Sequence, residues 1–112
     1  MHDIRKTTVG YDITLTRGDT LVLQLNLMKN KAPFTPSEGS VIRFAMKVKY
    51  DDNTVELEKQ ISLDTLVLHI EPNDTKNLVM GKTYVYDIEL TDESGNVDTF
   101  IKGKFNIDYE VK

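Results

Sequence analysis

The 112-residue sequence contains no cysteine. The chain therefore forms no disulfide and has no thiolate for a zinc or redox site. A core without cross-links is typical of proteins made in a reducing cytoplasm. The length fits one domain, which buries roughly two thirds of the surface that its unfolded chain exposes.

Long apolar runs are also missing. Residues 1–6 lack the apolar stretch of a signal peptide, and no segment is long enough to cross a bilayer. The net charge is −4, with 14 basic and 18 acidic residues whose signs are interleaved. A nucleic-acid-binding protein usually clusters a basic excess on one face. We therefore expect a soluble protein made in the cytoplasm, with neither nucleic acid nor membrane as a partner.

Apolar and polar residues instead alternate over long stretches. Every second residue from Val97 to Val111 is apolar, small or threonine, and the same period runs through residues 21–27, 42–50 and 84–90. A period of two indicates strands with one buried face. Turn residues recur about every ten positions, as in sandwiches and barrels. We predict an all-β, antiparallel immunoglobulin-like sandwich of seven strands at residues 11–16, 20–28, 41–50, 55–61, 65–70, 82–91 and 96–111.

This domain is expected to span residues 11–112, after a flexible tail at residues 1–10. Its core should take the odd-numbered leucines of 21–27, the even-numbered residues of 42–50 and 84–90, and the odd-numbered residues of 97–111. Gly103 is predicted to mark a bulge or bend in the last strand. In the two longer connections, Phe34 should close one end of the sandwich. Asp74 should cap a single helical turn that Leu78 holds to the core.

Charged residues are expected to pair across strands. If Tyr50 lies opposite Val55, then Lys47 faces Glu58 and Lys49 faces Glu56. If Leu90 lies opposite Val97, Glu89 faces Asp98, an unfavourable pair of like charges unless a bulge shifts it.

The sequence offers little catalytic chemistry. Its two histidines are His2, in the expected tail, and His69, predicted to face solvent, so no base stands beside a nucleophile. Asp87 and Glu89 share a strand face, which the alternation already explains. The acidic turns at 51–53 and 92–94 lack the ligand series of a calcium loop. We expect no enzyme activity, no catalytic or metal-binding residue and no cofactor.

Two features leave a binding role open. Arg17-Gly18-Asp19 is the tripeptide used by integrin ligands, although it also suits a turn between strands. Tyr84 and Tyr86 would suit a sugar platform if exposed, but their phase predicts rings in the core with hydroxyls at its margin. A carbohydrate-binding or cell-adhesion module is thus the alternative function.

Six segments taken in order, ITLTRGDT (13–20), VIRFAMK (41–47), IEPNDT (70–75), GKTYVYDIEL (81–90), GNVDT (95–99) and GKFNI (103–107), carry a resemblance to a known family. The chain resembles small tail-associated domains of phages and prophages, in particular the N-terminal immunoglobulin-like domain of phage baseplate upper proteins. The resemblance implies a structural module of the virion tail, made in the bacterial host cytoplasm. Its implied partners are other tail or baseplate proteins, with homo-oligomers in the assembly.

The long strand at residues 96–111 is the expected docking element. A strand of this length should overhang its neighbour and leave backbone donors and acceptors free for another chain. Lys102, Lys104, Asp108 and Glu110 would guard this edge and select a partner of matching charge.

Overall fold

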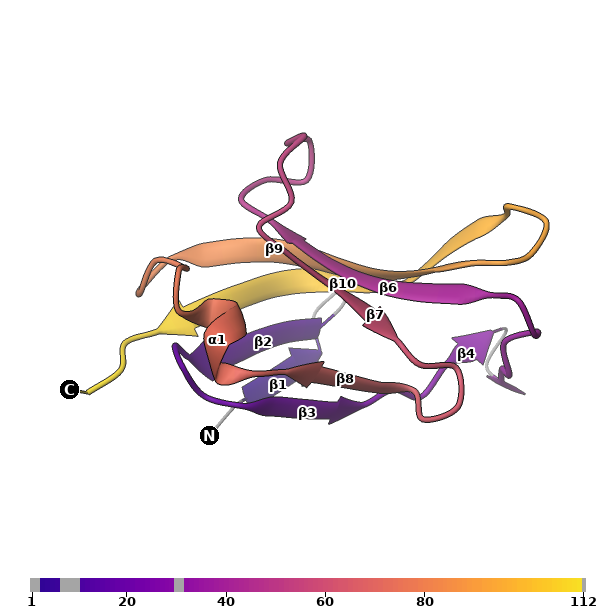
Figure 1. Cartoon of the computed structure of the whole chain (residues 1–112), viewed down its shortest axis with the longest axis horizontal. Coiled ribbons are helices and arrows are strands. Elements are labelled where there is room, and N and C mark those ends of the chain that lie inside the picture. The colour runs from indigo at the N-terminus through magenta and orange to yellow at the C-terminus, as the bar shows by residue number, and fades with distance from the viewer. Residues whose placement is uncertain (1–2, 7–10, 30–31, 112) are drawn as a thin grey trace.

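The computed structural model describes residues 3–6, 11–29 and 32–111, and its regular secondary structure is almost entirely β-strand (Figure 1). The all-β prediction is confirmed. The strands are β1 (Asp3–Lys6), β2 (Tyr11–Thr16), β3 (Leu21–Gln24), β4 (Met28–Lys29), β5 (Ala32–Pro33), β6 (Val41–Lys47), β7 (Leu57–Ile61), β8 (Val67–Ile70), β9 (Thr83–Thr91) and β10 (Val97–Asp108). The helix α1 covers Pro72–Thr75.

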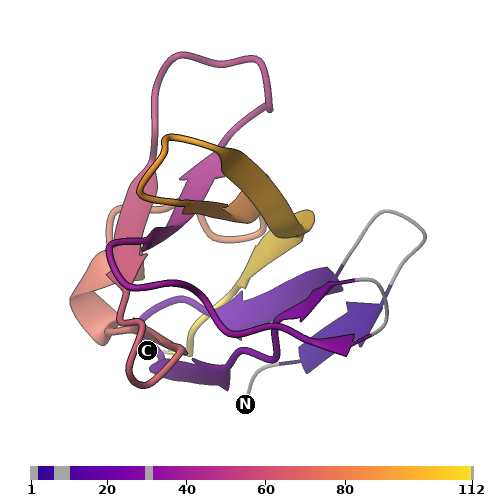
Figure 2. The same ribbon diagram turned by 90° about the vertical axis from the view of Figure 1, so that its right-hand side faces the viewer.

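Six strands form the main sheet, in the order β1-β2-β10-β9-β6-β7, while β3 pairs with β8 and β4 with β5. The main sheet is curved, and β3 and β8 lie across from β9 and β6 (Figures 1 and 2). One pair departs from the antiparallel prediction, because β2 runs parallel to β10. These two strands are far apart in the chain, so no tight turn forces them to be antiparallel.

The core lies between the main sheet and the β3-β8 pair. Phe44, Tyr86 and Phe105 form its aromatic centre, with ring centroids 5.6–6.0 Å apart. The predicted inward faces are confirmed on β6 and β9, and from Gly103 to Ile107 on β10. The prediction is wrong for Tyr50, which lies beyond β6, and for Val97 and Thr99, which lie before the register shift of β10; all three are exposed. The buried aliphatic side chains include Ile13, Leu15, Leu21, Leu25, Leu27, Ile42, Ile61, Leu68, Ile70, Leu78, Ile88, Leu90 and Ile107.

Two predicted segments differ from the structure. Residues 1–10 carry too little apolar pattern to predict a strand, yet Asp3–Lys6 form β1, antiparallel to β2. The backbone of β2 offers a second edge opposite β10, and β1 pairs with it. Residues 1–2 and 7–10 of the expected tail lie outside the described residues. The strand predicted at 20–28 stops at Gln24, and β4 begins at Met28.

A bulge sets the pairing of β9 and β10. The register shifts between Thr99 and Ile101, so Phe100 is the extra residue. Nearer the turn, Val97 lies opposite Thr91 and not opposite Leu90 as assumed from the sequence, so the like-charge pair expected between Glu89 and Asp98 is not formed. The bulge also brings Phe100 onto Phe34, with ring centroids 5.6 Å apart, so Phe34 packs against one end of the core as predicted.

Gly103 has a different role from the predicted bulge. Strand β10 continues through it, and a Cβ built at this position would lie 1.9 Å from the Tyr11 carbonyl oxygen. The absence of a side chain therefore allows the backbones of β2 and β10 to approach where they begin to pair.

The helical turn begins before the predicted cap. Glu71 is the N-cap and Pro72 the first helical residue, a position that suits proline because it lacks an N–H. Asp74 lies in the first turn, where its carboxylate accepts a hydrogen bond of 2.7 Å from the Glu71 N–H. Leu78 is buried and holds the turn to the core, as predicted.

We predict that Gly103→Ala destabilises the fold by about 3 kcal/mol, because the added methyl group overlaps the Tyr11 backbone. Urea unfolding followed by circular dichroism measures the change. Gly95→Ala is the control. Gly95 has a φ of +89° but open space around it, so we expect a loss of only about 1 kcal/mol. Equal losses in both variants would contradict the role given to Gly103.

Candidate functional site

The predicted docking strand β10 lies inside the main sheet. It pairs with β9 from Val97 to Asn106 and with β2 from Phe105 to Asp108. The prediction of a free edge along this strand is therefore wrong where β2 pairs. Local alternation gives the buried face of a strand but not its neighbours, and β2 joins from the opposite end of the chain.

The four residues assigned to that edge have different surroundings. The Lys102 ammonium lies 5.5 Å from the centre of the Tyr50 ring. Lys104 is exposed, and its backbone N–H donates to the Asp12 carboxylate at 3.0 Å. Asp108 is exposed, whereas Glu110 accepts a hydrogen bond of 2.8 Å from Arg17 Nε. They do not form one cluster, and their docking role stays a prediction.

The side of β6, β7, β9 and β10 that is turned away from the core forms a broad surface, which we call the outer face. In Figure 1, β3, β8 and α1 all lie on the other side of β6 and β9. Val41, Thr91 and Val97 lie directly opposite one another at one end of this face, and both valines are about half exposed. The outer face comprises Val41, Arg43, Lys47, Glu58, Asp87, Glu89, Thr91, Val97 and Lys102.

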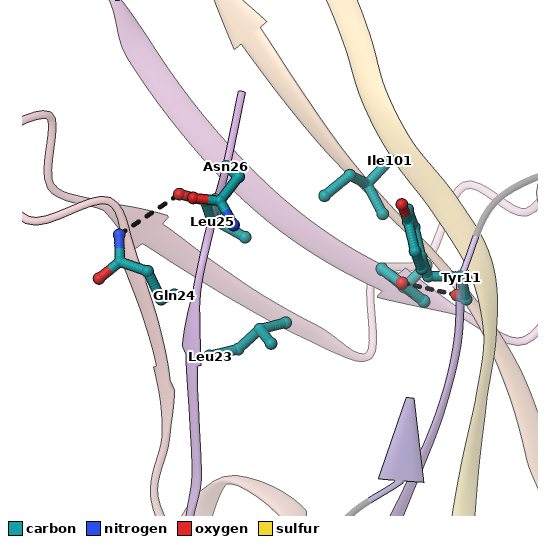
Figure 3. Close-up of a pocket in the computed structure, with 7 residues that line it drawn as sticks. Tyr11, Leu23, Gln24, Leu25, Asn26 and Ile101 are labelled. Atoms are coloured by element: carbon teal, nitrogen blue, oxygen red, sulfur yellow. Dashed lines mark hydrogen bonds between the residues drawn. The ribbon is translucent and has the colours of Figure 1, made fainter. Parts of the chain in front are cut away.

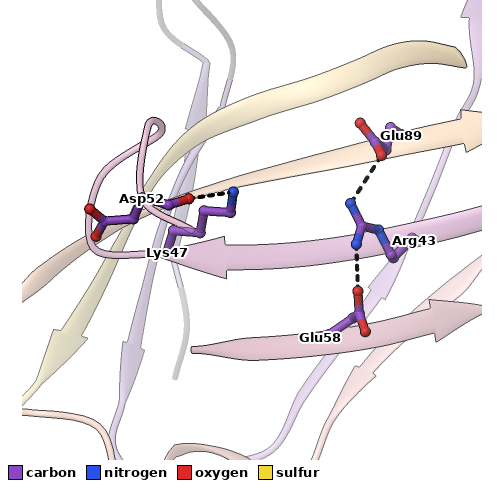
Figure 4. A network of polar contacts seen from close by, with 5 residues as sticks. All are labelled: Arg43, Lys47, Asp52, Glu58 and Glu89. Carbon is purple, nitrogen blue, oxygen red and sulfur yellow. Dashed lines mark hydrogen bonds and ion pairs between the residues drawn. The ribbon is translucent and has the colours of Figure 1, made fainter. Parts of the chain in front are cut away.

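Arg43 joins three strands on the outer face (Figure 4). One guanidinium nitrogen lies 2.5 Å from Glu58 on β7, and another lies 3.0 Å from Glu89 on β9. An arginine that bonds two carboxylates is held in one orientation. The outer face thus presents its charges in a fixed pattern.

The predicted lysine–glutamate pairs are wrong. Glu58 lies opposite Ala45, two positions away from the register that would place it beside Lys47. Lys47 instead donates to the Asp52 carbonyl at 2.8 Å. Lys49 and Glu56 lie outside the ladder, because β6 ends at Lys47 and β7 begins at Leu57.

A polar hollow of about 150 Å³ lies between Tyr50 and the middle of β6 and β9. The Tyr50 hydroxyl donates to the Gly103 carbonyl at 3.0 Å, so its ring lies against the sheet. Burial first, and then the charge of Glu89, raise the pKa of Asp87 above its ordinary value. Nearby cations oppose this rise without cancelling it. The hollow therefore favours the neutral form of Asp87 relative to water.

An apolar hollow of about 190 Å³ opens between the two sheets (Figure 3). Leu23 of β3 and Ile101 of β10 line its opposite sides. At its base the Tyr86 hydroxyl donates to the Tyr11 carbonyl at 2.7 Å. Burial raises the pKa of Tyr86, so this phenol stays protonated. The hollow is smaller than sites for drug-sized ligands.

The two sequence features that suggested a binding role, the Arg17-Gly18-Asp19 tripeptide and the tyrosines of β9, make contacts within the domain. Arg17 bonds Glu110, and another of its nitrogens donates to the Leu78 carbonyl at 3.3 Å. Its guanidinium is thus engaged within the domain, which supports the structural role of the tripeptide. Tyr84 and Tyr86 are buried, as predicted, so they form no sugar platform.

His69 is exposed on β8, as predicted. Among the described residues, no three His, Asp or Glu side chains are grouped so as to hold a metal ion. Within the same part of the chain, no helix has the length and apolar character needed to span a membrane.

Comparisons with protein families, with characterised proteins and with solved structures find no match to this chain.

We predict opposite pH effects for two aspartates. The pKa of Asp87 is higher in the folded state than in the unfolded chain. Asp87 therefore contributes to the stability of the fold at low pH, and this contribution is lost as pH rises through its folded-state pKa. Asp87→Asn should therefore gain stability relative to the parent between pH 3 and pH 7. Thermal unfolding across this range measures the difference.

Asp92→Asn provides the contrast. A backbone hydrogen bond from Asn96 is the main cause of the lowered pKa of Asp92. Asp92 therefore contributes to the stability of the fold above the ordinary aspartate pKa, and this contribution is lost as pH falls. The variant should therefore lose stability relative to the parent over the same rise in pH. Changes of the same sign in both variants would contradict these environments.

Proposed function

We propose that this protein is a non-enzymatic structural module of a phage or prophage tail or baseplate, and that it acts by docking to other proteins. Three features support the proposal: the sequence resemblance, the strand order and the outer face. The outer face is the observation that carries it, because it combines an exposed apolar row with fixed charges.

The strand order supports an immunoglobulin-like sandwich. In that fold, strands C, F and G belong to one sheet, and B pairs with E in the other. Here β6, β9 and β10 take the places of C, F and G, and β3 and β8 take those of B and E. Strands β2 and β7 extend the first sheet on its two sides.

The outer face has the chemistry of a docking surface. Val41 and Val97 offer apolar area at one end, which a partner can remove from water. Next to them, Arg43 bonds both Glu58 and Glu89, so a partner meets charges that are already oriented. Oriented charges select partners and register more than they add affinity. A tail assembly, which repeats the same contacts many times, needs this kind of selectivity.

The partners proposed are further copies of this chain and neighbouring tail or baseplate proteins. The decisive test of membership is mass spectrometry of purified phage particles, together with inspection of the genes beside the coding sequence. Peptides of this chain in particles, with tail genes adjacent, would support the proposal. A gene distant from phage genes and a chain absent from particles would overturn it.

We predict that Val97→Asp weakens self-association about tenfold, because it places a charge where apolar area is buried. Light scattering over a concentration series measures the change. Val22→Asp is the matched control, since Val22 is a strand residue with the same 56% exposure but belongs to the β3-β8 sheet. A parent protein that stays monomeric at every concentration, or equal effects of the two variants, would contradict docking through the outer face.

A further inference from the structure

The end of β10 and the start of β9 lie side by side at the other end of the main sheet (Figure 1, left). A third hollow is lined by residues of these two strand ends. Its volume is about 380 Å³, larger than either hollow described above. Strands β2, β9 and β10 contribute to it, together with the residues flanking β9 and β10. Its lining includes the side chains of Thr14, Lys82, Thr83, Asn106, Asp108 and Tyr109.

Tyr109 is an exposed aromatic residue in a fixed segment. It is 65% exposed, yet both of its neighbours in the chain are held. The Asp108 carbonyl accepts a hydrogen bond of 3.1 Å from the Arg17 N–H, and the Glu110 carboxylate bonds the Arg17 side chain at 2.8 Å. An aromatic surface held in this way loses little freedom when a ligand binds.

The Tyr109 ring rests on Gly81. A Cβ at residue 81 would lie 2.4 Å from the Tyr109 hydroxyl oxygen, so any side chain there would push the ring away. Gly81 also has a φ of +80°, which L-residues rarely adopt. Two independent requirements for glycine thus coincide beside the exposed ring.

A ladder of polar side chains crosses three strands beside Tyr109. The Thr83 hydroxyl on β9 donates to Oδ1 of the Asn106 side chain at 2.8 Å. The Asn106 amide on β10 donates to the Thr14 hydroxyl on β2 at 3.2 Å. These two bonds fix the side-chain amide of Asn106. Its second N–H, the second lone pair of Oδ1 and the hydroxyl hydrogen of Thr14 remain available to bond a ligand.

Opposite charges flank the hollow. The Lys82 ammonium lies 5.3 Å from the centre of the Tyr84 ring, and the Asp108 carboxylate accepts a hydrogen bond of 2.9 Å from the Tyr109 N–H. The two charges are opposite and both are engaged within the domain, so the hollow favours neither a cation nor an anion. The ladder presents donors and acceptors, and Tyr109 presents an apolar surface. A sugar ring matches this combination, because it carries hydroxyls around its rim and C–H groups on its faces.

We propose that this hollow is a carbohydrate-binding site for a neutral sugar of one or two rings, which lies on Tyr109 and bonds the Thr14–Asn106–Thr83 ladder. The site differs from the buried Tyr84 and Tyr86. It also lies at the opposite end of β10 from the Val97 row, so it goes beyond the docking proposed above.

The test is an NMR titration of the whole chain, labelled with ¹⁵N, with methyl glycosides of glucose, galactose and N-acetylglucosamine at millimolar concentration. At least one sugar should shift the Gly81, Asn106 and Tyr109 amide signals and the Asn106 side-chain signal in a saturable way. Tyr109→Ala should weaken this binding about tenfold, as expected for loss of an aromatic contact. Tyr109→Phe should preserve it.

Tyr50→Ala is the control, because Tyr50 is another half-exposed tyrosine but lies in the other polar hollow. It should leave sugar binding unchanged. Asn106→Ala should weaken binding without changing the signals of β6 and β7, which shows that the fold is kept. Absence of saturable shifts with all three glycosides, or shifts unaffected by both Tyr109→Ala and Asn106→Ala, would overturn the site. Neither result bears on self-association, which Val97→Asp tests.

Discussion

The contact of the Tyr11 carbonyl with β9 and β10 fixes how the first and last parts of the chain meet. Its oxygen accepts the hydrogen bond of the buried Tyr86 hydroxyl and lies against Gly103, where no side chain fits. The parallel pairing of β2 with β10 begins two residues farther along each strand. That register then places Thr14 beside Asn106 and brings Arg17 to Glu110. The polar ladder and the fixed position of Tyr109 both depend on this contact.

Much of the fold follows from the sequence because burial repeats along each strand. Alternation was sufficient to assign the inward faces of β6 and β9, since one side of each strand meets the core along its whole length. The pairing of strands is harder to predict from the sequence, because many registers satisfy the same alternation. The hairpin pairs Val97 with Thr91 and not with Leu90, so Asp98 faces Leu90 and Glu89 faces Thr99, which alternation alone could not predict.

The candidate sites divide in the same way. The burial of the two tyrosines of β9 can be predicted from the alternation alone. The pairing of β10 cannot, because one of its partners is β2, a strand nearly a hundred residues away in the chain. Tyr109 continues the odd-numbered apolar series of β10, so periodicity assigns it to the core. The strand ends at Asp108, however, and the side chain of Tyr109 lies at the surface. Strand ends are where a two-residue period loses its predictive value, and an exposed aromatic residue at such an end is the signal to seek.

The position of β10 has a consequence for biosynthesis. This strand follows every other described strand in the chain, yet it lies in the interior of the main sheet. While the ribosome is still adding residues 97–108, β2 and β9 have no strand between them, and the side chains of Phe44 and Tyr86 lack Phe105. Closing such distant contacts is slow compared with forming a local hairpin. The main sheet is therefore incomplete until β10 is made, and the outer face becomes an ordered surface only after β10 has inserted between β2 and β9.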